Sequence, residues 1–355
     1  MDQKQKKRLL WQIPFLIALI AGTVWVIKNQ HDMPYQNNKG MIFGTVYEIT
    51  YQHGTNLQQE IEQQMRLVDN ALSMFNQESV ISHISKNEPY DLESEAGQMF
   101  LDVFNLAVKI SKDTDGAFDI TVAPLVNAWG FGFKNDDMPS ATKVDSIRQF
   151  VGYQRISCLN GNIKKSDPRV TLDCSAIAKG YGCDVVARYL ESKGVTNYMV
   201  MIGGEIVTRG INPTRLPWRI GVTKPTDDTL NVENENQTVL NVTDKAMATS
   251  GNYRRFYYKD GKKYAHTIDP KSGYPVQHSL LSATVLADNC ATADAYATSF
   301  MVMGIDRAKE VLKRHKELMA YFIYSDDKGE LAVWYSPTLE DKIDKRLDTD
   351  GQTEP

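Results

Sequence analysis

Hydrophobic and polar positions follow two spacings along the chain, one typical of strands and one of helices. Residues 43–51 alternate and are rich in β-forming side chains, whereas residues 57–74 place apolar side chains on one helical face. The same reading predicts helices over 94–113, 176–193, 291–302 and 305–315, and strands over 197–202, 218–222, 239–242, 282–286, 318–324 and 331–335. Because strands and helices do not alternate strictly, we expect an α+β fold with a mixed or antiparallel sheet and flanking helices.

The amino-terminal pattern differs from the rest. Lys4, Lys6, Lys7 and Arg8 precede an apolar run over 11–27, which is at the lower limit for a membrane-spanning helix. Basic residues on that side favour a cytoplasmic amino terminus. We therefore expect a transmembrane anchor over 1–28, with a cleaved signal peptide as the alternative.

The remaining chain divides by composition. Residues 29–40 are polar with Pro and Gly and predict a linker, 41–338 form the folded domain, and 339–355 form a polar, charged tail. A net charge of -4 leaves no basic surplus for phosphates, so nucleic acid is not an expected partner. The four cysteines form no CxxC pair and predict small buried residues, with a disulfide open if the domain is exported.

Asp294 and Thr298 stand four residues apart at the start of a predicted helix. Residues at this spacing share one helix face, and their oxygens suit Mg²⁺. The plainer alternative is an acidic residue at the positive end of a helix dipole, with Thr298 in the core.

Three further blocks contain candidate binding groups. The glycine turn of 116–119 exposes backbone N–H groups, and a strand–turn at 203–205 allows close approach of a ligand. The block 173–180 opens a helix, whose free N–H groups favour phosphate, and Lys179 adds a cation. His266 precedes an Asp-Pro pair and is a candidate general base, although a lone histidine is more often structural.

Read together, the blocks resemble the ApbE family of FAD:protein FMN transferases. The similarity rests on ATSGNYRR at 248–255, AHTIDPKSGYPV at 265–276, ATADAYAT at 291–298, GAFDITVAPL at 116–125 and DCSAIAKG at 173–180. It implies a single catalytic domain of the T-fold-related ApbE type.

The resemblance also implies roles for individual residues. His266 and Lys179 would be catalytic, and the carbonyl of Ala176 would ligate Mg²⁺ with Asp294 and Thr298. The residues implied to bind FAD are Phe43, Phe75, Ala117, Phe118, Asp119, Asp173, Lys179 and Ile268. Phe43 stands where the family often has Met, and Phe75 where it commonly has Tyr or Trp.

The implied reaction is Mg²⁺-dependent transfer of the FMN moiety of FAD to a Thr or Ser hydroxyl of an acceptor protein, with release of AMP. Implied acceptors are FMN-binding subunits of ion-pumping or electron-transfer membrane complexes. The expected location is the inner membrane, with the catalytic domain on the periplasmic side. Two alternatives stay open: a metal-dependent FAD pyrophosphatase that releases AMP and FMN, and a flavin-binding protein without turnover.

Overall fold

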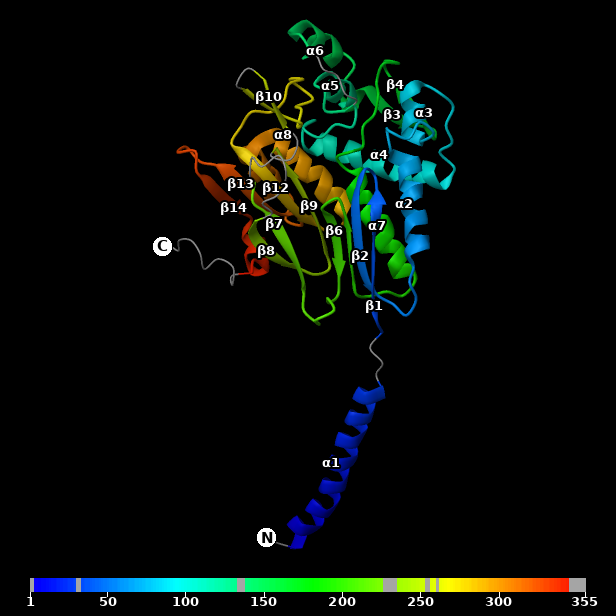
Figure 1. Cartoon of the computed structure of the whole chain (residues 1–355), viewed down its shortest axis with the longest axis vertical. Coiled ribbons are helices and arrows are strands. Elements are labelled where there is room, and N and C mark those ends of the chain that lie inside the picture. Colours follow the sequence, from blue (N-terminus) through cyan, green and yellow to red (C-terminus); the bar gives the residue numbers. More distant parts are fainter. Residues whose placement is uncertain are drawn as a thin grey trace.

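The structure is a computed structural model of the whole chain (Figure 1). It describes residues 3–29, 33–132, 138–225, 235–252, 256–259 and 262–344. Within these ranges an extended antiparallel sheet carries a layer of helices on one face.

The central sheet has the order β1-β2-β5-β6-β9-β12-β13-β14, and every neighbouring pair is antiparallel. This confirms the antiparallel form of the predicted α+β fold. Its strands are β1 (Tyr35–Ile42), β2 (Thr45–Gln52), β5 (Tyr198–Ile202), β6 (Glu205–Arg209), β9 (Lys245–Gly251), β12 (Leu280–Ala287), β13 (Met319–Ser325) and β14 (Leu331–Tyr335).

Three two-stranded ribbons complete the described strands: β3 (Ile156–Leu159) with β4 (Asn162–Lys165), β7 (Trp218–Thr223) with β8 (Asn236–Val242), and β10 (Phe256–Lys259) with β11 (Lys262–Ala265). The β7–β8 ribbon packs on the sheet. Its Ile220 and Leu240 share an apolar cluster with Met247 of β9 and Leu286 of β12.

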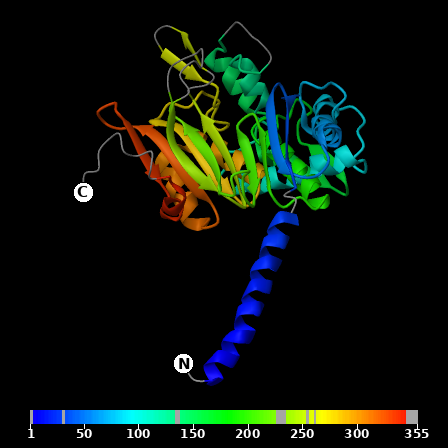
Figure 2. The same ribbon diagram turned by 60° about the horizontal axis from the view of Figure 1, so that its bottom comes forward.

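Helices cover the opposite face of the sheet (Figures 1 and 2). Val285 of β12 packs there with Phe300 of α8 and Phe104 of α4, while Ile49 of β2 packs with Ile61 of α2 and Val186 of α7. The helices are α2 (Gln58–Leu72), α3 (Val80–Lys86), α4 (Glu95–Asp113), α5 (Ala123–Ala128), α6 (Ala141–Arg148), α7 (Ala178–Ser192) and α8 (Cys290–Arg314), with 3-10 turns η1 (Tyr153–Arg155) and η2 (Pro337–Lys342).

Local signals explain where several helices begin and bend. The Ser94 hydroxyl accepts a hydrogen bond from the Gly97 amide and caps α4, and Asn289 caps α8 through the Thr292 amide. Gly304 has φ 78° inside α8 and divides it into two segments. The two helices predicted over 291–302 and 305–315 are therefore confirmed.

The predicted linker over 29–40 is wrong from Tyr35 onward, because β1 begins there. Its partner β2 follows after a turn at Phe43 and Gly44, which have φ of 53° and 71°. The strand was missed because its buried side is polar. Asn38 is 1 % exposed and accepts a hydrogen bond from the Tyr51 hydroxyl at 2.9 Å.

Folded structure also continues past residue 338, where the polar tail was predicted to begin. Leu339 is fully buried against the β7–β8 ribbon, and the buried Asp344 carboxylate lies 2.7 Å from an Arg219 guanidinium nitrogen. Ile343 packs against the same cluster and pairs with Leu240 of β8. Residues 345–355 of the predicted tail lie outside the described residues.

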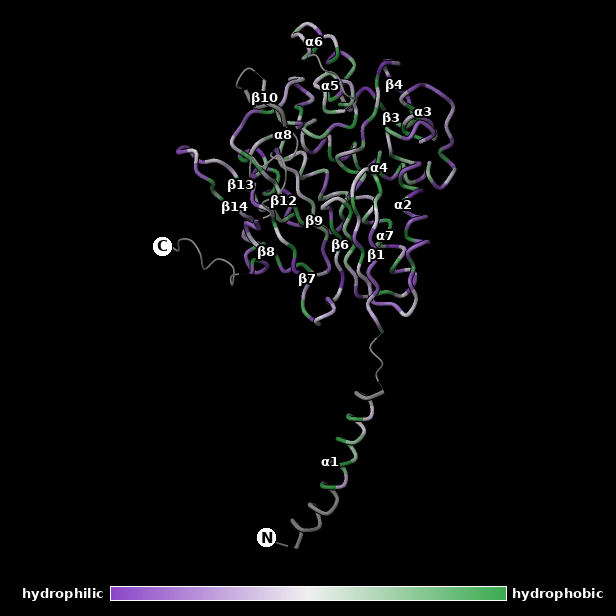
Figure 3. Tube along the Cα trace, viewed as in Figure 1, coloured by the Kyte–Doolittle hydropathy of each residue, from purple (hydrophilic) through white to green (hydrophobic). Residues whose placement is uncertain are grey.

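The segment predicted as an anchor is the helix α1 (Gln3–Asn29), which is drawn away from the sheet and shows apolar positions along its middle (Figures 1 and 3). Large apolar side chains such as Phe15 and Trp25 are 68 % and 65 % exposed. Among the described residues, no helix is both long enough and apolar enough to cross a membrane.

Candidate active site

The start of α7 lies directly against the start of α8. A Cβ atom added to Gly180 would stand 2.7 Å from the carbonyl carbon of Cys290, so only glycine allows this approach. The buried Asp184 carboxylate accepts hydrogen bonds from the Cys290 and Ala291 amides at 2.7 and 2.9 Å. It satisfies free N–H groups at the start of α8 and locks the two helices together.

Asp294 points from α8 into the first turn of α7. Its Oδ2 accepts a hydrogen bond from the Gly180 amide at 3.1 Å. In a regular helix this amide would bond to the carbonyl of Ala176, four residues earlier. The Asp294 carboxylate takes the place of that carbonyl as the acceptor of the Gly180 amide.

Thr298 lies one turn beyond Asp294 on α8 and is half-buried. The three oxygens predicted to bind a cation thus come from two helix starts in direct contact. A carbonyl, a carboxylate and a hydroxyl suit Mg²⁺, which often binds through few protein groups together with substrate phosphates. The described residues contain no cluster of three or more His, Cys, Asp or Glu side chains that could hold a metal.

Lys179 lies beside this group. Its Nζ is 3.4 Å from Oε1 of Glu205 and donates a hydrogen bond to the Ser175 carbonyl at 3.3 Å. Burial works to lower the pKa of Lys179, but the Asp294 and Glu205 carboxylates outweigh it and raise the pKa. Burial raises the pKa of Asp294, and Lys179 opposes that change.

Phe43 joins the same region from the β1–β2 turn. A Cβ atom added to Gly182 of α7 would lie 2.8 Å from the Phe43 ring. The ring packs against both apolar clusters on the helical side of the sheet. The structure therefore brings Phe43, Ala176, Lys179 and Asp294 to one end of α7.

Asp173 shapes the turn that leads into α7. Its Oδ1 accepts a hydrogen bond from the Ser175 amide at 2.7 Å, and its own amide donates to the Ile120 carbonyl at 2.7 Å. The second contact ties the 173–180 block to the 116–119 block, as expected if both face one ligand.

The 116–119 turn is itself buried. Ala117 and Phe118 are 5 % and 2 % exposed. Asp119 accepts hydrogen bonds from Thr121 through Oδ1 and from the Tyr153 amide through Oδ2 at 2.6 Å. Both carboxylate oxygens thus stabilise the turn, and the implied contact with FAD remains a prediction.

His266 follows β11, and its ring meets the Phe131 ring edge-on with centroids 6.5 Å apart. Ile268, which was implied to touch FAD, is 5 % exposed in a small core with Leu125 and Trp129. Asp269 accepts hydrogen bonds from the Lys271 and Ser272 amides, so it forms a turn.

The Thr249–Gly251 block is not a simple turn, because it is the end of β9, where the Thr249 and Thr284 hydroxyls lie 2.8 Å apart. Tyr253 and Arg254 lie outside the described residues.

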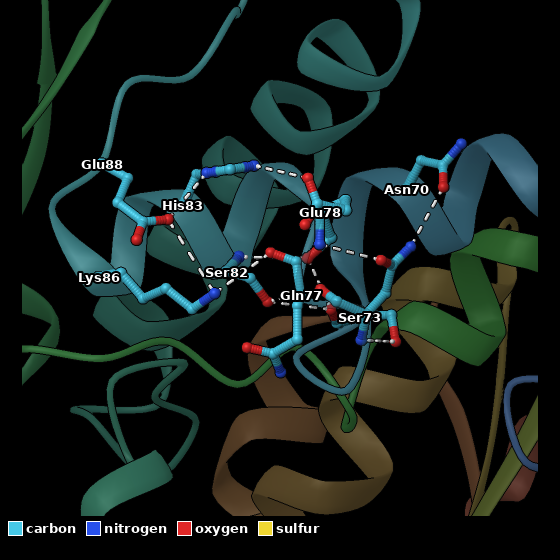
Figure 4. Close-up of polar contacts among 10 residues, drawn as sticks. Asn70, Ser73, Gln77, Glu78, Ser82, His83, Lys86 and Glu88 are labelled. Carbon is cyan, nitrogen blue, oxygen red and sulfur yellow. Dashed lines mark hydrogen bonds and ion pairs between the residues drawn. The ribbon is translucent and has the colours of Figure 1, made fainter.

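Phe75 is 62 % exposed in the loop between α2 and α3. Figure 4 shows the polar contacts that hold this loop: Ser82 Oγ donates to the Ser73 carbonyl, Lys86 Nζ to the Gln77 carbonyl, and the Glu78 amide to the Asn76 side chain. Phe75 therefore sits on a loop fixed by its own hydrogen bonds, and its contact with FAD remains a prediction.

Glu205 was named in the sequence only as the end of a glycine turn, and no role was assigned to its side chain. The structure places its carboxylate against Lys179, buried at 4 % exposure. The signal that could have found it is an acidic residue directly after Gly203-Gly204 at the start of a strand.

Comparison with known proteins identifies the family to which this chain belongs. The ApbE family model matches residues 43–322. A curated "FAD:protein FMN transferase" of Escherichia coli strain K12 is 34% identical over 346 residues, which cover 91% of this chain and 96% of the relative. One from Vibrio cholerae serotype O1 is 37% identical over 299 residues, covering 81% of this chain and 87% of the relative.

Solved structures agree. The flavin transferase ApbE from Vibrio cholerae matches with a TM-score of 0.78 at 35% identity, covering 87% of this chain and 99% of its own. The apo form of the Pseudomonas stutzeri flavinyl transferase ApbE matches with a TM-score of 0.76 at 28% identity, covering 87% and 96%. The fold is thus that of solved flavin-transferring enzymes. The chain belongs to the ApbE family, and the prediction of an ApbE-family enzyme is confirmed.

Proposed function

We propose that this enzyme transfers the FMN moiety of FAD to a threonine or serine hydroxyl of an acceptor flavoprotein, in a reaction that requires Mg²⁺. The observation that carries the proposal is that the Asp294 carboxylate of α8 binds the Gly180 amide in the first turn of α7, next to Lys179. Such a group of oxygens and one cation at a helix start suits the diphosphate of FAD.

In the proposed reaction, the acceptor hydroxyl attacks the FMN-side phosphorus of FAD. The bond between this phosphorus and the bridging oxygen breaks, and AMP leaves. His266 takes the proton of the attacking hydroxyl. FMN stays on the acceptor as a phosphoester.

Lys179 stabilises negative charge on the phosphates. Its ammonium group is already charged, since the pKa is raised by Asp294 and Glu205. The amide groups at the start of α7, a helix of 15 residues, add the positive end of its dipole.

Ala176, Asp294 and Thr298 would hold Mg²⁺ beside the diphosphate. When bound, the ion supplies Lewis-acid charge stabilisation to phosphate oxygens. The buried Asp294 carboxylate supports this assignment, because burial raises its pKa and a cation would offset the cost of its charge.

We further propose that the catalytic domain acts on the periplasmic side of the inner membrane, on FMN-binding subunits of electron-transfer or ion-pumping complexes. The basic cluster before residue 11 and the exposed apolar side chains of α1 support attachment to a membrane. Fractionation of cells, with protease added to intact spheroplasts, tests this location. Recovery of the full chain in the cytoplasmic fraction would contradict it.

The reaction is tested by measuring AMP and free FMN by chromatography after incubation of the full chain with FAD and Mg²⁺, with and without a purified FMN-binding acceptor subunit. We expect AMP only when the acceptor is present, with little free FMN. Equal AMP and FMN without acceptor would instead show a pyrophosphatase. Intact FAD in every sample would leave a flavin-binding protein.

A further inference from the structure

We propose that Glu205 is a positioning residue for FMN transfer: it holds the Lys179 ammonium group at the phosphate side of the site and keeps it from closing on Asp294. The inference rests on the proposed function, because it concerns how Lys179 meets the diphosphate of FAD. Glu205 itself would touch neither FAD nor the acceptor.

The first observation is the burial of the Glu205 carboxylate. The residue is 4 % exposed, and Oε2 is buried with no hydrogen-bond partner among the described residues. A buried charge costs several kcal/mol unless it is paired. Lys179, at 3.4 Å from Oε1, is the cation that offsets this cost.

The second observation is how the donors of Lys179 are used. An ammonium group has three N–H donors. One is directed to the Ser175 carbonyl at 3.3 Å, and Glu205 lies 3.4 Å away. The Lys179 side chain is 29% exposed, and neither contact uses its third donor. The contacts with Ser175 and Glu205 therefore fix the direction of the third N–H donor of Lys179.

The third observation is the glycine turn that delivers Glu205. Gly203 has φ 65°, and a Cβ atom added there would lie 2.8 Å from Thr45 Cγ2 and 3.1 Å from Lys179 Cδ. Because Gly203 has no side chain, the aliphatic part of the Lys179 side chain fits beside it. On the other side, the Cys183 thiol donates to the Glu205 carbonyl at 3.2 Å. Lys179 and Cys183 lie one turn apart on α7, and both contact Glu205.

Asp294 explains why positioning is needed. Its carboxylate attracts Lys179 as that of Glu205 does, and both raise the pKa of Lys179. If Glu205 lost its charge, Lys179 would turn toward Asp294 and occupy the carboxylate that we assign to Mg²⁺. Competition of this kind would raise the Mg²⁺ concentration needed for transfer.

The test compares Glu205→Gln, Lys179→Met and the double variant in the full-length protein. For each we measure kcat, the Mg²⁺ concentration at half-maximal rate, the FAD dissociation constant by flavin fluorescence, and Tm. We expect E205Q to lower kcat about tenfold or more and to raise the half-saturating Mg²⁺ concentration severalfold. The double variant should be no slower than K179M by more than about twofold, because Glu205 acts through Lys179.

The matched control is Glu191→Gln. Glu191 lies on α7, the helix that carries Lys179, and its carboxylate pairs with Arg209 away from the site. It should keep kcat within about twofold. Glu205→Asp, which retains the charge, should recover part of the E205Q loss; it also keeps the test decisive if E205Q lowers Tm strongly.

Two results would overturn the inference: an E205Q variant with the kcat and Mg²⁺ dependence of the parent protein, or losses from E205Q and K179M that multiply fully in the double variant. If the parent protein transfers no FMN at all, the proposed function fails instead. The FAD dissociation constants of the four proteins would still report whether Glu205 and Lys179 act as a unit.

Discussion

Buried charged side chains dominate the candidate site at the scale of single residues. Lys179, Glu205 and Asp294 come from α7, β6 and α8. The two carboxylates stabilise the Lys179 charge, Lys179 in turn stabilises both carboxylates, and the Gly180 amide adds a hydrogen bond to Asp294. Charges that cannot be satisfied by water must be satisfied by partners, which fixes their geometry. Fixed geometry before substrate binding is what electrostatic catalysis requires.

His266 has two possible roles, one catalytic and one structural, and a single substitution distinguishes them. If it accepts the acceptor's proton, His266→Ala should bind FAD with the parent affinity and lose transfer by about 10²–10⁴-fold. Flavin fluorescence measures the binding, and AMP release measures the turnover. A variant that unfolds would support a structural role, since the neighbouring Thr267 and Ile268 are buried.

His315 should make stability depend on pH. Partial burial lowers its pKa, but hydrogen bonds to Asp113 at 3.0 Å and Glu317 at 2.9 Å outweigh this and raise the pKa of His315. The protonated ring therefore stabilises the fold fully below an unfolded pKa of about 6.5, and this is lost as pH rises through the folded value.

The measurement is chemical denaturation of the parent protein and His315→Gln at pH 6 and pH 9. We expect the variant to lose about 0.5–1 kcal/mol more at pH 6 than at pH 9. Equal losses at both pH values would show that the ring acts only by packing against Tyr296.

Some of these residues could be found from sequence and others could not. Asp294 and Lys179 were found because a carboxylate four residues before a threonine, and a lysine at a helix start, have a chemical meaning in one dimension. The role of Glu205 could not be found, because its partner is 26 residues away in the chain and only the fold joins them. Asp119 was implied to bind FAD, but its carboxylate bonds to Thr121 in its own turn and to the Tyr153 amide 34 residues further along the chain.

At the scale of elements, the contact between α7 and α8 forms the site. Gly180 permits the close approach of the two helices, and the Asp184 carboxylate stabilises it by a hydrogen bond to the Cys290 amide. Long amphipathic helices and apolar strands were readable from their periodicity, as α2, α4 and β12 show. Edge strand β1 was not, because its inward side carries Gln36, Asn38 and Gly40, with Ile42 as its one apolar residue.

Gly180→Ala tests this contact. The added methyl group would stand 2.7 Å from the Cys290 carbonyl carbon, so α8 must move away from α7. We expect a stability loss of about 1–3 kcal/mol by chemical denaturation and a marked loss of Mg²⁺-dependent turnover.

Gly54→Ala is the matched control, because nothing lies within 4 Å of its added Cβ atom. The denaturant concentration at the midpoint of its unfolding should equal that of the parent protein. A G180A variant with parent stability and turnover would show that the close approach of the two helices is not required.

At the scale of the whole molecule, an antiparallel sheet lies between a helical layer and the β7–β8 ribbon. Such a sheet brings together segments far apart in sequence: the 116–119 turn, the 173–180 block and the start of α8 are joined by the Ile120–Asp173 and Gly180–Asp294 hydrogen bonds. The fold class could be predicted from the absence of strict strand–helix alternation. The strand order could not, because β6 and β9 were not predicted as strands; β6 begins within the 203–205 glycine turn.

We propose that FMN transfer depends on the Asp294 carboxylate held between α7 and α8. The most direct measurement is the intact mass of an FMN-binding acceptor subunit after incubation with FAD, Mg²⁺ and either the parent protein or Asp294→Asn. Asp288→Asn, an exposed residue just before α8, is the matched control. We predict that the parent protein and D288N add the mass of one FMN, that chelation of Mg²⁺ prevents it, and that D294N reduces the rate about 10²-fold or more. Full-rate addition by D294N, or by the parent protein without divalent cations, would contradict the account.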